Sequence, residues 1–143
     1  MKKVLDLWFY AFSRRSLRHI RALIADMTLD MGLREEESYD IETVVEEALA
    51  NAMEHAYPEG YGPIKIVIRR VKGGISIVVR DWGKPLSPDV LEVAADVEEW
   101  FKEGKERGMG IAFMKALVDK FEYKNLSDGK EIRLFKKLKA GKP

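Results

Sequence analysis

Two polar residues one helical turn apart, Glu47 and Asn51, are the first candidates for chemistry in this sequence. His55 follows four residues later, so an α-helix would align all three side chains in one polar column. A carboxylate and a carboxamide on a packed helix can hold a base and a metal ligand in a fixed relation. A solvated helix face is the alternative interpretation, because charged faces of this kind are common.

Two glycine-containing segments later in the chain could serve the same site. Asp81-x-Gly83-x-Pro85 follows an alternating strand pattern, and Gly108-x-Gly110 precedes a helical pattern. Glycines let the backbone approach a ligand closely, and free N–H groups at a helix start favour an anion such as a triphosphate. Each segment alone also fits an ordinary turn. Their occurrence together, in this order, favours a shared site over coincidence.

The remaining chain predicts the elements that must position these segments. The hairpin is the clearest: isoleucines alternate with polar residues on both sides of a Gly73-Gly74 turn, which indicates a sheet covered by helices on one face. Residues 35–38 read as a solvated connection, with Ser38 or Asp40 capping the next helix. In order, we expect a strand over 4–12, a helix ending near 31 with Gly32 as C-cap, a helix ending at 57, strands over 64–69 and 75–80, helices over 88–101 and from 108, and strands over 121–126 and 131–138.

Composition limits the functions that the chain can have. Its 143 residues suffice for one domain with a core, and 25 Lys and Arg balance 24 Asp and Glu, which argues against a general nucleic-acid binder. The absence of cysteine excludes disulfides, thiolate zinc sites and thiol nucleophiles. No apolar run reaches membrane-spanning length and no signal-peptide core is evident, so we expect a cytoplasmic protein.

Four segments give the sequence a family resemblance. Residues 47–57 are similar to an asparagine-containing helix motif, 80–85 to an adenine-binding Asp-x-Gly motif, 106–111 to the glycine motif after an ATP lid, and 129–134 to the strand that closes the site. The chain thereby resembles the histidine-kinase-like ATPase superfamily, which has the Bergerat fold, over residues 4–138. Within it, the small size and the helix ending His55-Ala56-Tyr57 look most like the anti-sigma-factor serine kinases.

The resemblance implies the fold and the ligands. We expect one domain over 1–143 in the α+β class, a two-layer sandwich with a mixed, mainly antiparallel sheet, helices on one face and an ATP lid over 86–107. ATP and Mg²⁺ are the implied cofactors. Asn51 would hold Mg²⁺ through its carboxamide oxygen, and oxygen ligation suits that ion. Asp81 would accept a hydrogen bond from the adenine amino group, and Gly83 would leave room for the base.

The remaining implied roles concern phosphoryl transfer. Glu47 would act as general base for the incoming serine hydroxyl or would orient it. Backbone amides of the segment Gly108-Met109-Gly110 would meet the phosphates, and Arg107 or Lys105 would add positive charge near the γ-phosphate. Phosphoryl transfer needs mostly positioning and charge neutralisation, so these few groups suffice.

The implied function is an ATP-dependent serine protein kinase that sequesters a sigma factor and phosphorylates a small anti-anti-sigma protein, without direct contact to nucleic acid or membrane. Two alternatives stay open: a nucleotide-binding module that sequesters a partner without phosphotransfer, and the catalytic domain of a histidine kinase. The aromatic run 7–10 is either a homodimer surface or an ordinary sheet edge.

The sequence departs from the family pattern at two places. Lys130-Glu131 stand where many relatives carry threonine near the adenine, so contacts from that strand to the base are not carried over. Arg107 directly precedes Gly108, whereas in relatives a residue often stands between the arginine and the glycine. The family motif therefore does not by itself assign Arg107 a contact with phosphate.

Overall fold

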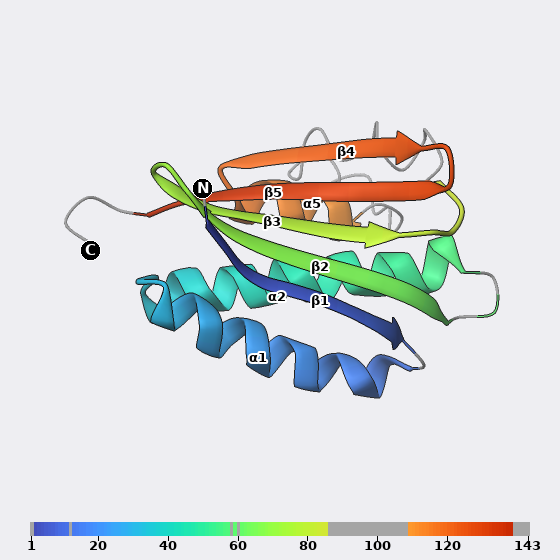
Figure 1. Cartoon of the computed structure of the whole chain (residues 1–143), viewed down its shortest axis with the longest axis horizontal. Coiled ribbons are helices and arrows are strands. Elements are labelled where there is room, and N and C mark those ends of the chain that lie inside the picture. Colours follow the sequence, from blue (N-terminus) through green and yellow to red (C-terminus); the bar gives the residue numbers. More distant parts are fainter. Residues whose placement is uncertain (1, 12, 58, 60, 86–108, 139–143) are drawn as a thin grey trace.

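A five-stranded sheet forms one layer of the protein. The computed structural model describes residues 2–11, 13–57, 59, 61–85 and 109–138. The strands lie in the order β1-β2-β3-β5-β4, and every pairing in this part of the chain is antiparallel (Figure 1). Their bounds are β1 Lys2–Ala11, β2 Gly62–Val71, β3 Gly74–Asp81, β4 Lys120–Leu126 and β5 Gly129–Lys137.

Helices form the second layer. Helix α1 packs on α2, and α2 packs on α5, so the three cover one face of the sheet together (Figure 1). The predicted α+β two-layer architecture is therefore confirmed. The predicted helix over 88–101 and the lid over 86–107 lie outside the described residues. The helical segments are η1 Arg14–Ser16, α1 Leu17–Asp30, α2 Glu35–Asn51, the π-helical η2 Ala52–Ala56 and α5 Met109–Leu117.

The core lies between the two layers. Alternate residues of the central strands point toward the helices, because strand side chains alternate between faces. Ile66 of β2 pairs with Val79 of β3, and Val79 pairs with Ile132 of β5, so an apolar row crosses the sheet. These side chains and their helical partners are almost fully buried: Ile64, Ile68, Ile77, Leu134, Ile24, Ile41, Val45, Leu49 and Met114.

The junction of α1 and α2 corrects one sequence prediction. Helix α1 ends at Asp30 with Met31 as its C-cap, one residue before the predicted Gly32. Gly32 follows the cap with φ 102°, and the Leu33 N–H returns to the Thr28 carbonyl at 3.1 Å. Helix α2 then begins at Glu35, so residues 35–38 are its first turn and no solvated connection exists there. Acidic residues in that turn complement the positive end of the helix dipole.

Ser38 has a different role from the predicted cap. Its hydroxyl is buried and lies 2.7 Å from the Thr28 hydroxyl, while it donates to the Ala25 carbonyl at 3.0 Å. The backbone N–H of Arg34 is instead satisfied by the Glu37 carboxylate at 3.0 Å. Ser38 therefore joins α1 to α2, which orients the helix that carries Glu47 and Asn51.

The strand hairpin also turns one residue earlier than predicted. Lys72 and Gly73 form the turn, with Gly73 at φ 82°, and Gly74 already pairs with Val71 as the first residue of β3. The strands extend beyond the predicted 64–69 and 75–80 because cross-strand pairing continues through residues that break the alternating pattern. At the other end, this pairing carries β3 to Asp81.

Candidate functional site

The end of α2 carries the first two candidate residues. Glu47 and Asn51 are half-buried one turn apart, while Ala48 and Leu49 between them are buried in the core. After Asn51 the chain continues as a π-helix, so the regular spacing that predicted a column reaching His55 ends at Asn51. Short π-helical segments of this kind occur frequently at functional sites.

Asn51 has an unsatisfied amide group. Its Nδ2 atom is buried and has no hydrogen-bond partner among the described residues. A buried polar atom without a partner costs free energy that a ligand can recover. Rotation of the carboxamide exchanges its nitrogen and oxygen, so the same group can present oxygen to a cation. This observation fits the expected role in Mg²⁺ binding.

Asp81 lies at the end of β3 and is 2% exposed. Its Oδ1 accepts the Gly83 N–H at 3.0 Å, which closes a tight turn around the carboxylate. Its Oδ2 lies 2.5 Å from the Lys130 ammonium. The expected base-recognition residue is therefore buried and already forms an ion pair within the chain.

Lys130 belongs to this site, although sequence reasoning treated it only as a departure from the family pattern. It is 1% exposed, and its ammonium also donates to the Lys84 carbonyl at 3.3 Å. The alternation of inward-facing and outward-facing residues in β3 and β5 could have predicted this burial. Asp81 is two residues beyond inward-facing Val79, and Lys130 is two residues before inward-facing Ile132, so both must face the helices. The register then sets Asp81 directly opposite Lys130.

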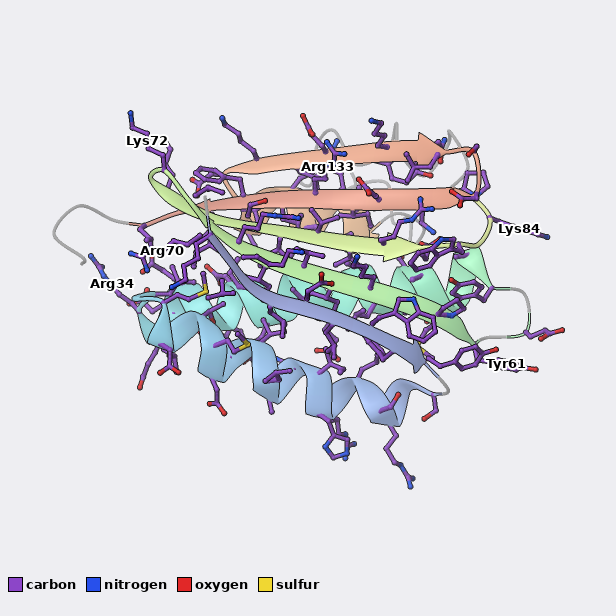
Figure 2. All side chains as sticks on the ribbon, in the orientation of Figure 1. Arg34, Tyr61, Arg70, Lys72, Lys84 and Arg133 are labelled. Atoms are coloured by element: carbon purple, nitrogen blue, oxygen red, sulfur yellow. The ribbon has the colours of Figure 1, made fainter. Side chains whose placement is uncertain are left out.

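Gly83 connects this loop to the helix that carries Asn51. The Lys84 N–H donates to the Ala56 carbonyl at 2.8 Å, and a Cβ at Gly83 would lie under 3.0 Å from that carbonyl oxygen. The absent side chain therefore permits contact between the loop and η2. Its predicted purpose, room for a base, stays a prediction. Figure 2 shows the Lys84 side chain extending away from the protein, so only its backbone serves the site.

Tyr57 makes a second connection that sequence reasoning missed. Its hydroxyl donates to the Pro63 carbonyl and accepts the Trp82 N–H at 2.9 Å. Burial raises the pKa of this hydroxyl, so the neutral form is favoured. The end of the Asn51 helix is thus tied both to the start of β2 and to the Asp81 loop.

The third candidate segment is only partly described. Met109 and Gly110 begin α5, whose Ile111, Ala112 and Met114 are buried. Because α5 packs on α2, the helix start lies in the same layer as Asn51. The helix predicted from 108 is confirmed from Met109 onward, whereas Gly108 and Arg107 themselves lie outside the described residues.

The described residues offer no ready-made metal site of acidic, histidine or cysteine side chains. No group of three His, Cys, Asp or Glu residues that could hold a metal ion occurs in the described ranges. A cation here would thus depend on Asn51, phosphate oxygens and water, which is how Mg²⁺ is commonly bound. None of the helices described is long and apolar enough to cross a membrane.

Comparisons with known proteins identify the class. The family model described as "Histidine kinase-like ATPase domain" matches residues 11–136. The chain belongs to this histidine-kinase-like ATPase family. The four segments that carry the sequence resemblance all lie within the matched residues.

Individual relatives within the family are proteins named anti-sigma F factor and serine-protein kinase RsbW. The chain is 32% identical to the anti-sigma F factor of Heyndrickxia coagulans, with 96% of this chain and 95% of that protein covered. It is 30% identical to the anti-sigma F factor of Geobacillus stearothermophilus, over 83% of this chain and 81% of that protein. It is 27% identical to the serine-protein kinase RsbW of Halalkalibacterium halodurans, where 73% of this chain spans 66% of the relative's length.

A solved structure supports the fold. A chain in the crystal structure of the SiaB–SiaC complex from Pseudomonas aeruginosa superposes with a TM-score of 0.64. The match covers 94% of this chain and 89% of that chain, at 14% sequence identity. At that identity the likeness concerns the fold alone.

Proposed function

We propose that this protein is an ATP-dependent serine kinase and anti-sigma factor that phosphorylates a small anti-anti-sigma protein and sequesters a sigma factor. The observation that carries the proposal is the unpartnered amide of Asn51, one turn after Glu47, on the helix tied to the Asp81 loop. Relatives named anti-sigma F factor and serine-protein kinase RsbW support it. The proposed role places the chain in the cytoplasm, with protein partners and without direct contact to nucleic acid or membrane.

The proposal gives each residue the role that the family resemblance implies. Asn51 holds Mg²⁺, Glu47 takes the proton from the incoming serine hydroxyl, and Asp81 faces the base. When bound, Mg²⁺ neutralises charge on the transferring phosphate. As the family resemblance implies, backbone amides of the segment from Gly108 to Gly110 meet the phosphates, and Arg107 or Lys105 adds positive charge.

The kinase proposal is tested at Glu47. We expect Glu47→Gln to lower phosphotransfer to a co-purified partner by about 100-fold or more, because a positioned base typically contributes that much. ATP affinity should stay within about twofold, since the carboxamide keeps the shape of the side chain. Glu36→Gln, an exposed change on the first turn of α2, is the matched control. Unchanged transfer by Glu47→Gln would show that Glu47 is not the base.

A second candidate function is a nucleotide-binding module that sequesters its partner without transferring phosphate. The buried Asp81–Lys130 ion pair favours it, because the pair changes the part of the site that would receive the base. ATP binding measured beside a phosphotransfer assay separates the two: affinity without transfer supports the module, and transfer supports the kinase.

The homodimer predicted from residues 7–10 is a further part of the proposal. Strand β1 is an edge of the sheet, and Trp8 on it is exposed. An exposed apolar edge favours pairing with another strand. Sedimentation at micromolar concentration tests it, and a monomer would remove the dimer from the proposal.

A further inference from the structure

The Asp81–Lys130 pair is unusual for its burial. Lysine is among the residues least often buried, and taking two charges out of water costs several kcal/mol per ion unless hydrogen bonds satisfy them. Here both side chains are almost completely buried, with the ammonium 2.5 Å from the carboxylate. An apolar pair would fill the same space without that cost, so the charges point to a further purpose.

The pair has unused hydrogen-bonding capacity on both partners. A carboxylate offers about four acceptor positions and an ammonium offers three donors. Asp81 uses acceptor positions for Gly83 and Lys130, and Lys130 uses donors for Asp81 and the Lys84 carbonyl. Among the contacts of the described residues, this leaves spare acceptor positions and one spare donor beside each other at the end of β3 and the start of β5.

A neighbouring donor and acceptor match the edge of a purine base. A lone carboxylate accepts from the 6-amino group of adenine but repels the 6-oxo group of hypoxanthine or guanine, since two acceptors then face each other. An ammonium next to the carboxylate gives a 6-oxo oxygen a donor and leaves the carboxylate to accept the neighbouring ring N–H. The same pair can also accept the adenine amino group and donate to the adjacent ring nitrogen.

We propose that Lys130 is a specificity-determining residue of the nucleotide site, and that it lets the site accept 6-oxopurine nucleotides together with adenine nucleotides. The proposal rests on the proposed nucleotide site but not on phosphoryl transfer. A purely structural ion pair would hold β3, β5 and the Lys84 loop together and would leave the base preference unchanged.

The first experiment compares the binding of ATP and ITP to the unmodified chain in the presence of Mg²⁺. The base of ATP carries a 6-amino group, whereas the base of ITP carries a 6-oxo group and a proton on the neighbouring ring nitrogen. Calorimetric titration should give dissociation constants within roughly tenfold of each other, because neither base leaves a buried partner unsatisfied. An ATP preference above about 100-fold would overturn the proposal. This measurement needs no variant.

The second experiment removes the donor. Lys130→Met should shift the ITP-to-ATP ratio of dissociation constants in favour of ATP by about tenfold or more, since the 6-oxo group then faces Asp81 alone. Lys130→Arg keeps a donor and should retain ITP binding. Lys72→Met is the matched control, because Lys72 lies exposed at the opposite end of the β2–β3 hairpin and points outward (Figure 2). An unchanged ratio in Lys130→Met would overturn the proposal.

The outcomes distinguish the proposed role of Lys130 in base preference from the proposed kinase activity. Phosphotransfer with a ratio that Lys130→Met does not alter removes the role of Lys130 and leaves the kinase in place. A shifted ratio without phosphotransfer removes the kinase and leaves the role of Lys130 in place. Failure of the folded chain to bind either nucleotide overturns both.

Discussion

Asn51 and Asp81 lie at two ends of the same candidate site and differ in how their polar atoms are satisfied. Asp81 has a partner on each carboxylate oxygen, Gly83 on one and Lys130 on the other. Asn51 carries a buried amide nitrogen with no partner among the described residues. Both lie on elements fixed by the same contacts of the β3 loop with η2.

This difference indicates at which end of the candidate site a buried polar atom would gain a partner only from a ligand. A satisfied ion pair adds to the stability of the protein only while both partners remain, whereas an unsatisfied amide lowers stability until something binds it. The Asp81 end therefore keeps partners within the chain whether or not a base uses its remaining acceptor positions, whereas the buried amide nitrogen of Asn51 has none among the described residues. Variants at the two ends should change the free energy of unfolding in opposite directions.

The largest expected effect is at Asp81. Asp81→Asn leaves the Lys130 ammonium buried without a counter-charge, which should lower the free energy of unfolding by about 3–5 kcal/mol. Chemical denaturation measures the change. The double variant Asp81→Asn with Lys130→Met should recover most of the loss, because the unpaired charge is gone. A double variant no more stable than Asp81→Asn alone would contradict this account.

A smaller loss is expected at Gly83, where the two ends of the site meet. Gly83→Ala forces a Cβ against the Ala56 carbonyl, and the resulting displacement should cost about 1–3 kcal/mol. Amide hydrogen exchange should also show reduced protection of Lys84, whose N–H donates to the same carbonyl. Protection and stability equal to those of the parent protein would show that the loop adapts without strain.

The connection through Tyr57 should be weaker and dependent on pH. Tyr57→Phe removes the hydrogen bonds to Pro63 and Trp82 and should cost about 1 kcal/mol at neutral pH. Burial raises the pKa of Tyr57 above its ordinary value of 10.0, so the neutral hydroxyl contributes stability that is fully present below pH 10.0. That contribution is lost as the pH rises through the raised pKa.

Denaturation curves from pH 8 to 11 check the sign of this effect. The parent protein should lose its advantage over Tyr57→Phe at the alkaline end. Tyr39→Phe, an exposed tyrosine on α2, serves as the control. A difference that grows with pH would contradict the assignment to burial.

The smallest effect on stability is expected at Asn51, with the opposite sign. Asn51→Leu replaces an unpartnered amide with apolar atoms of similar size and should leave the free energy of unfolding unchanged or raise it by about 1 kcal/mol. Binding of Mg²⁺-nucleotide should weaken at the same time. A substantial loss of stability would mean that Asn51 has a structural role, and the contrast with Asp81 would disappear.

Much of this site could be predicted from the sequence. Helix formers and an apolar stripe predicted the helix with Glu47 and Asn51, and the alternating isoleucines predicted the hairpin that ends at Asp81. The partners of these residues could not be predicted in the same way. Ser38 reads as a cap in the sequence, but tertiary packing buries it against Thr28, and no local pattern encodes that contact.

The sequence by itself determined the order of the described elements through its periodicity, and its resemblance to a known family supplied the two-layer architecture. The tertiary structure alone decided that Lys130 reaches Asp81, that Ala56 fills the space beside Gly83 and that Asn51 keeps an unpartnered amide. The physical reason is that the strand register and the packing of η2 on the β3 loop involve residues far apart in the chain. Spacing along the sequence cannot specify which of their polar atoms meet.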